Sequence, residues 1–141
     1  LFRSHDFIGR AALEKLEKQP HRRKVWLRWS NDDAVRIYAS LLGNGERYKY
    51  MEIPNAFYSI LPFDKVLVGG KLAGLSTYTV YTVNVRSWFS LAMIDETIAD
   101  GAEVRLVWGE PNGGSNRPMV ERHVQTEVRA AVSYERLNAH P

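Results

Sequence analysis

The feature that most constrains the fold is a series of short strand-like segments in the second half of the chain, separated by glycine-containing turns. Residues 64–68 and 71–81 flank Gly69-Gly70, and paired glycines accept the positive φ angles of a type I′ hairpin turn. Alternating apolar residues at 104–108 and 124–132 predict two further strands, each with one buried face. From residue 64 onward the pattern therefore predicts strands.

The first half of the chain combines two helices with one strand. Residues 7–18 predict a short helix with Asp6 as its N-terminal cap, and the alternation in residues 24–29 predicts a strand. A second, amphipathic helix is expected over residues 34–41, with its cap among the polar residues 31–33.

The remaining segments predict connections and one more strand. Residues 46–62 are aromatic and contain two prolines, which indicates a structured loop packed on the body. Residues 88–94 form an apolar run, residues 95–101 have the acidic start and glycine stop of one helical turn, and residues 110–118 have a loop composition. Such short strands, joined by hairpins and one long crossing, predict a mostly β fold with short helices. We expect a small closed antiparallel β-barrel, with a split sandwich as the alternative.

Composition limits the chemistry that such a barrel can perform. The 141 residues include no cysteine, which removes disulfides, thiolate zinc sites and cysteine nucleophiles. A net charge of +3 is too small to predict a nucleic-acid-binding face, and no apolar run is long enough to predict a membrane span. A cytoplasmic location is the expectation. Because the sequence begins at Leu1 rather than at methionine, we expect a piece of a longer protein.

The residues alone predict no catalytic or metal-binding motif. Four histidines lack the i,i+4 spacing of a helical zinc site: His5, His21, His123 and His140. The adjacent acids Asp32-Asp33 and Asp95-Glu96 lie where helix caps are needed. We therefore predict no catalytic residue and no metal ligand within this chain.

Three aromatic residues raise the question of which face they occupy. Trp26 lies between Lys24 and Arg28, on the strand face opposite the apolar one, so it either contacts another protein or packs under the 31–42 helix. Tyr78 and Tyr81 lie on opposite sides of one expected strand, so both cannot belong to the core.

Six short segments, in order along nearly the whole chain, match the pattern of a known family. Residues 6–13 read D-F-I-G-R-A-A-L, residues 70–77 read G-K-L-A-G-L-S-T, and residues 100–104 read D-G-A-E-V; the other three are 22–27, 91–94 and 128–132. They resemble segments of the C-terminal barrel domain of the glycine cleavage T-protein (aminomethyltransferase) family, which read D-F-I-G-[RK]-x-A-L, G-K-x-V-G-x-V-T-S and P-G-T-E-V.

The departures from that pattern indicate a branch of the family. Residues 78–83 read Y-T-V-Y-T-V where the amine-transferring branch has S-G-x-x-S-P, and residues 31–58 form an insertion. Both features, with residues 106–114, are more similar to the tetrahydrofolate-dependent O-demethylases, which take methyl from methoxy-aromatic acids such as vanillate or syringate.

The resemblance implies one domain of a larger enzyme that transfers a one-carbon unit to tetrahydrofolate. Residues 1–20 would be a helix and linker from N-terminal folate-binding domains of the same parent chain, and residues 21–141 would be the barrel, with a helical insertion at about 31–58. The barrel would close the folate channel against a small methoxy-aromatic substrate held mainly by those domains, and would be inert alone.

The resemblance also places candidate cofactor contacts on one hairpin. Tyr78, Tyr81 and Arg86 would face the folate channel, because tyrosine offers a ring and a hydroxyl and arginine binds carboxylates. The alternative is that these three side chains only pack against a neighbouring domain. Two other classes stay open: a self-sufficient barrel that binds a small ligand or nucleic acid through Trp26, Tyr78 and Tyr81, and a protein-interaction module.

Overall fold

A computed structural model describes residues 6–53, 63–114, 118 and 120–134 of the chain. The helices and strands follow one another in the order α1 (Arg10–Glu17), β1 (Arg22–Trp29), α2 (Asn31–Leu42), β2 (Asp64–Val68), β3 (Lys71–Thr82), β4 (Ser87–Asp95), β5 (Glu103–Trp108), the 3₁₀ turn η1 (Pro111–Gly114) and β6 (Thr126–Ser133). Among the described residues, no helix has the length and apolar character needed to cross a membrane.

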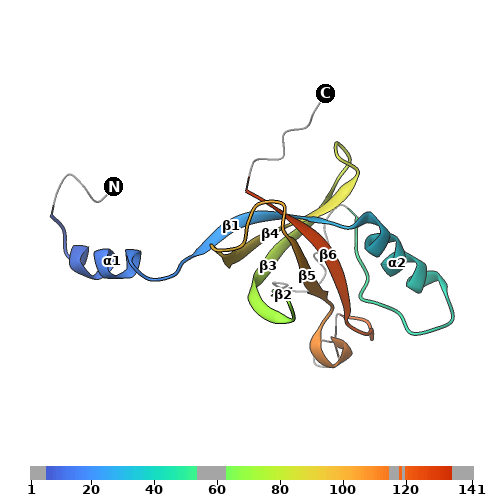
Figure 1. Cartoon of the computed structure of the whole chain (residues 1–141). Coiled ribbons are helices and arrows are strands. Elements are labelled where there is room, and N and C mark those ends of the chain that lie inside the picture. The colour runs from blue at the N-terminus through green and yellow to red at the C-terminus, as the bar shows by residue number, and fades with distance from the viewer. Residues whose placement is uncertain (1–5, 54–62, 115–117, 119, 135–141) are drawn as a thin grey trace.

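The strands close into a barrel in the order β1-β4-β3-β2-β5-β6, with every neighbouring pair antiparallel (Figure 1). Strand β1 closes the ring because it pairs with β4 along one edge and with β6 along the other. The prediction of a mostly β, closed antiparallel barrel is therefore confirmed, and the split sandwich is wrong.

Two glycine positions show how the chain permits this closure. Gly69 and Gly70 have φ angles of 56° and 78°, as the predicted type I′ turn between β2 and β3 requires. Gly74, on β3, lies so close to β4 that a Cβ atom there would approach the Met93 carbonyl oxygen to 2.2 Å. The absence of a side chain at residue 74 is therefore what lets the two strands approach.

The core is built on three tryptophans from three strands. The Trp29 ring lies 5.3 Å from the Trp108 ring, edge to face, and 6.2 Å from the Trp88 ring. The Trp29 indole N–H donates a hydrogen bond to the Ser90 hydroxyl, so this buried polar group is satisfied. Buried Ile37 joins this cluster from α2. The inward face predicted for residues 25, 27 and 29 is confirmed, because all three side chains are buried.

Both predicted helix caps are wrong. Helix α1 begins at Arg10 after Gly9, whose φ of 98° sets the N-terminal boundary; Asp6 only accepts the N–H of its neighbour Phe7. Helix α2 is capped by Ser30, whose hydroxyl accepts the Asp33 N–H. Serine and aspartate are both favourable N-cap residues, so the use of Ser30 as the cap depends on the tertiary contacts of Asp33.

The helical turn predicted at residues 95–101 is also wrong, because these residues form two successive turns. Their N–H groups are used elsewhere: Glu96 donates to the carbonyl of His21, and Gly101 donates to the carbonyl of Val132. These bonds to β1 and β6 replace the bonds that a helix would make.

Two segments were predicted to be loops, and the structure describes part of each. Lys49 and Met51 are buried, so the part of the 46–62 loop up to residue 53 packs on the body as predicted; residues 54–62 lie outside the described residues. The 110–118 loop contains η1.

Helix α1 has no buried residue and extends away from the barrel in Figure 1. Trp26 is half-buried on the outer face of β1.

Candidate functional site

The three predicted cofactor contacts lie along the β3–β4 hairpin but do not share one face. Tyr78 points outward and is 38% exposed. Tyr81 is half-buried and its ring lies 5.9 Å from the Trp88 ring, so it faces the core. Arg86 is exposed in the turn between the two strands. The structure therefore brings Tyr78 and Arg86 to the surface of this hairpin and turns Tyr81 inward.

The Arg86 turn is fixed by the first residue of α2. The Asn31 side-chain amide donates to the Arg86 carbonyl oxygen at 3.1 Å, and its oxygen accepts the Ser87 hydroxyl at 2.9 Å. Arg86 itself has a φ of 47°, a left-handed conformation that costs a residue with a side chain about 1 kcal/mol. Asn31 thus holds the Arg86 backbone in an unusual conformation, which presents the guanidinium at the hairpin tip.

A buried ion pair that the sequence did not predict lies near the ends of β2 and β5. The Lys49 side chain is 1% exposed, and its Nζ lies 2.9 Å from Glu110 Oε1. The ammonium also lies 5.0 Å from the centre of the Trp108 ring, a favourable position for a cation. Trp108 Nε1 donates to the Lys49 carbonyl oxygen. Lys49 is thereby anchored by its backbone and its side chain.

Asp64 brings a second carboxyl group to this region. It is 6% exposed, at the first position of β2, and its Oδ2 has no hydrogen-bond partner. Burial raises the pKa of Asp64 to about 7; Lys49 opposes this rise and Glu110 adds to it. Asp64 and Glu110 both line a cavity of about 60 Å³, with Gly109 and Gln125 also in its wall. We call this cavity the carboxyl pocket.

His123 fixes the backbone beside the carboxyl pocket. Its Nε2 accepts the Glu110 N–H at 2.7 Å, and its Nδ1 lies 2.8 Å from the Glu121 carbonyl oxygen. Because a backbone N–H can only donate, Nε2 carries the lone pair and the proton is on Nδ1. This buried histidine is neutral in this arrangement and orients Glu110 rather than binding a metal. Among the described residues, no group of three histidine or acidic side chains has the geometry to hold a metal ion.

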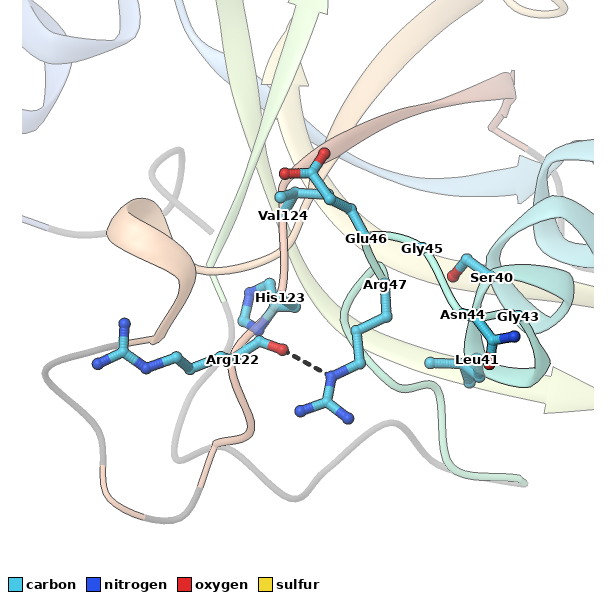
Figure 2. A pocket seen from close by; sticks show the side chains of 10 residues that line it. All are labelled: Ser40, Leu41, Gly43, Asn44, Gly45, Glu46, Arg47, Arg122, His123 and Val124. Atoms are coloured by element: carbon cyan, nitrogen blue, oxygen red, sulfur yellow. Dashed lines mark hydrogen bonds between the residues drawn. The ribbon is translucent and has the colours of Figure 1, made fainter.

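A larger hollow lies between the end of α2 and residues 122–124 (Figure 2). Arg47 Nε donates to the Arg122 carbonyl oxygen at 2.9 Å. Figure 2 shows the two guanidinium groups pointing in different directions. They do not converge on one position, so this hollow lacks the paired donors that recognise a carboxylate or phosphate.

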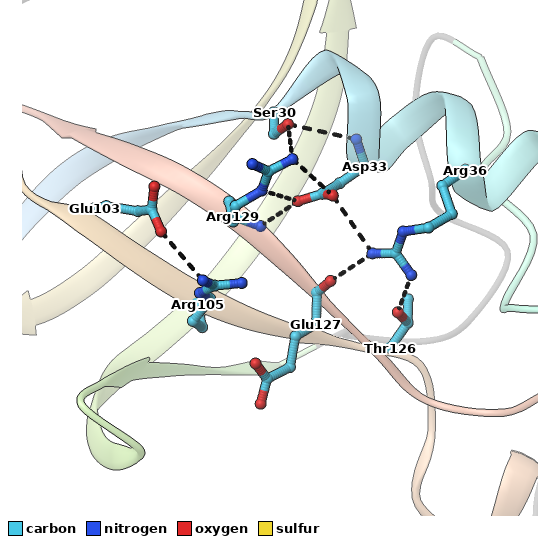
Figure 3. Close-up of polar contacts among 8 residues, drawn as sticks. All are labelled: Ser30, Asp33, Arg36, Glu103, Arg105, Thr126, Glu127 and Arg129. Atoms are coloured by element: carbon cyan, nitrogen blue, oxygen red, sulfur yellow. Dashed lines mark hydrogen bonds and ion pairs between the residues drawn. The ribbon is translucent and has the colours of Figure 1, made fainter.

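The other polar cluster clamps α2 to β6 (Figure 3). Asp33 accepts the Arg129 backbone N–H at 2.8 Å and the Arg129 Nε–H at 2.9 Å. Burial raises the pKa of Asp33, but the hydrogen bonds and charge of Arg129 outweigh it and hold the pKa below its usual value. Arg36 donates to Thr126 and to the Glu127 carbonyl oxygen. Because the carboxylate is saturated by its partners, this cluster is structural.

Comparison with known proteins identifies relatives of this chain. No protein-family model matches it. It is 48% identical over 130 residues to the syringate O-demethylase of Sphingobium sp. (strain NBRC 103272 / SYK-6). The aligned region covers 92% of this chain and 28% of that relative. It is 31% identical over 119 residues to the sesamin methylene transferase of Sinomonas sp. (strain No.22). This aligned region covers 77% of the chain and 26% of that protein.

These matches confirm the resemblance to the O-demethylase branch that the sequence segments predicted. The chain spans little more than a quarter of the length of either relative. It is a β-barrel relative of the syringate O-demethylase, over a region equal to 28% of that protein.

Proposed function

We propose that this chain is the C-terminal barrel domain of a tetrahydrofolate-dependent O-demethylase that acts on methoxy-aromatic acids of the vanillate and syringate type. The observation that carries the proposal is the 48% identity to syringate O-demethylase across 92% of the chain. A barrel with its own closed core, matching about a quarter of the relative, fits a domain rather than a whole enzyme.

The proposed role of the barrel is to close the folate channel of the parent protein. Tetrahydrofolate, when bound, supplies the acceptor for the methyl group. The barrel would limit the access of water to that transfer, and the proposal gives the chain no catalytic residue of its own. N-terminal folate-binding domains and the methoxy-aromatic substrate are the partners this role requires.

The β3–β4 hairpin suits a contact with folate in two respects. Folate carries carboxylates and planar rings, and the hairpin offers an exposed arginine and a partly exposed tyrosine, Arg86 and Tyr78. Asn31 fixes the Arg86 turn, which reduces the entropy lost when the guanidinium binds. Tyr81 stays a predicted contact through its hydroxyl group, because its ring packs on Trp88.

The test uses the parent protein beside the 141-residue chain. We expect the parent protein to demethylate vanillate or syringate only with tetrahydrofolate, and the 141-residue chain to be inactive. Demethylation by the chain alone would show that the active site lies within it. Salt-sensitive binding of single-stranded nucleic acid by the chain would instead support the self-sufficient binding barrel.

The hairpin contact has its own test in the parent protein. Arg86→Ala and Arg86→Gly both remove the guanidinium and should raise the KM for tetrahydrofolate about tenfold, equal to one charge-assisted hydrogen bond. The matched control is Arg105→Ala, because Arg105 is exposed on β5 and its guanidinium lies 3.4 Å from the Glu103 carboxylate. An unchanged KM in both Arg86 variants would leave Arg86 as a surface residue without a cofactor role.

A further inference from the structure

The carboxyl pocket is lined by a residue that has a polar atom left unsatisfied by the described residues. Asp64 lines the cavity and is more than nine-tenths buried, and its Oδ2 has no hydrogen-bond partner. Most buried polar groups in folded proteins are paired, because an unpaired one costs about 1–3 kcal/mol. The cavity in front of Asp64 is therefore the place to look for a missing partner.

The charges around the cavity specify the chemistry of that partner. Two carboxyl groups, Asp64 and Glu110, line the cavity, and one buried ammonium, that of Lys49, already pairs with Glu110. His123 is neutral in this arrangement and its Nε2 is occupied by the Glu110 N–H. Lys65 also lines the cavity but is an exposed residue at its rim. Among the described residues, the buried and partly buried side chains at this cavity thus include two carboxyl groups and one ammonium group, which favours a hydrogen-bond donor with positive charge.

The size of the cavity limits the partner to a single small group. A volume of about 60 Å³ exceeds the roughly 10–15 Å³ that one water needs. It is far below the roughly 300–1,000 Å³ of sites that enclose whole cofactors or aromatic substrates. The pocket therefore fits the head group of an amine or a guanidinium, and it is too small to enclose a whole folate.

We propose that the carboxyl pocket binds one protonated nitrogen group, an alkylammonium or a guanidinium, through Asp64 and Glu110. The group comes either from a free small amine or from a lysine or arginine side chain elsewhere in the parent protein. The binding is electrostatic: Asp64 loses its proton to solvent as the cation enters, and the cation donates to the carboxylate groups of Asp64 and Glu110.

The test follows the Asp64 carboxyl carbon by NMR in the ¹³C-labelled 141-residue chain as the pH is varied. Methylammonium chloride is the probe, and tetramethylammonium chloride at the same ionic strength is the control, because it has the same charge but no N–H donor and a larger radius. We expect methylammonium to lower the titration midpoint of Asp64 by about one pH unit, and tetramethylammonium to leave it unchanged.

Two variants separate binding from general effects on the fold. Asp64→Asn should abolish the chemical-shift changes that methylammonium causes around the pocket, and Lys65→Gln, at the rim, should retain them. The same Asp64 midpoint in both salts would overturn the proposal and leave the cavity as a site for water.

The same titration in the parent protein distinguishes the two sources of the cation. A midpoint that is already lowered, and that methylammonium does not change, would assign the pocket to a side chain of the parent protein. A midpoint that responds as in the 141-residue chain would assign it to a free amine. These readouts do not involve demethylation, so they are independent of the proposed function.

Discussion

The Asp33 carboxylate accepts both the backbone N–H and the guanidinium of Arg129, and so ties the first turn of α2 to the middle of β6. A single side chain thereby satisfies a strand N–H and holds a helix against the barrel. The clamp forms across 96 residues of sequence.

Loss of this clamp should appear as a change in acid stability. The folded pKa of Asp33 is below its unfolded value, so its contribution is present above about pH 4 and is lost as the pH falls through the folded pKa. Asp33→Asn should lower the free energy of unfolding at pH 7 by about 1–2 kcal/mol, a figure reduced for solvent screening. Urea denaturation between pH 3 and 7 should show this difference closing at low pH. Asp32→Asn, at an exposed neighbour, is the control and should cost little.

The Lys49–Glu110 pair should be costly to break from one side only. Lys49→Met leaves Glu110 without its buried cation, and such losses cost about 3–5 kcal/mol. The double variant Lys49→Met/Glu110→Gln removes both charges and should recover part of this loss, measured by urea denaturation. Strictly additive effects would show that the two side chains are not energetically coupled.

Asp64 should make the protein less stable as the pH rises, the opposite of Asp33. Its folded pKa of about 7 lies above its unfolded value of 3.8, so the folded state is favoured while the group is protonated. That contribution is full below about pH 4 and is lost as the pH rises through 7. The free energy of unfolding of the wild type should therefore fall, relative to Asp64→Asn, between pH 4 and 8. Parallel pH curves for the two proteins would contradict the raised pKa.

Residue 74 should tolerate no side chain in place of glycine, whereas residue 43 should tolerate one. A Cβ at residue 74 would lie 2.2 Å from the Met93 carbonyl oxygen and 2.7 Å from the Ile94 Cα, both backbone atoms. Gly74→Ala should cost at least about 2 kcal/mol, because strands β3 and β4 must separate. Gly43→Ala is the control: its φ of −92° is ordinary and its nearest neighbour would be 3.9 Å away. Thermal unfolding of the two variants gives the comparison.

The conformation of Arg86 gives a prediction that does not depend on any cofactor. Because its φ is 47°, glycine should fit this position better than alanine. In the 141-residue chain, Arg86→Gly should be about 1 kcal/mol more stable than Arg86→Ala. Equal stabilities in urea would mean that the turn relaxes to another conformation when the guanidinium is removed.

Local patterns were sufficient to predict most of the barrel. The turn at Gly69-Gly70 and the alternation in residues 25–29 and 104–108 depend on neighbours in sequence, and all three appear as expected. The predicted start of α1 failed for a local reason, because Gly9 has a φ of 98° and sets the boundary. The predicted start of α2 and the 95–101 segment failed for another reason. Each is decided by a partner distant in sequence: Arg129 for Asp33, and His21 and Val132 for the turns.

The buried charges could not be predicted in the same way. Lys49 and Glu110 are 61 residues apart, and each lies in a segment with the composition of a loop. Only the barrel order, which places β2 next to β5, brings them to Asp64. One signal was present in the sequence: a lysine flanked by Tyr48 and Tyr50 in an aromatic loop predicted to pack on the body.

The closure of the barrel by β1 has a consequence for how the protein is made. Among the six strands of the barrel, β1 is the first to be synthesised and β6, its second partner, is the last. Until residue 133 has left the ribosome, the sheet has two unprotected margins, β1 and β5, which are open to pairing with other chains. The half-buried Trp26 lies on one of those margins, so the nascent polypeptide is most vulnerable to aggregation just before its final strand emerges.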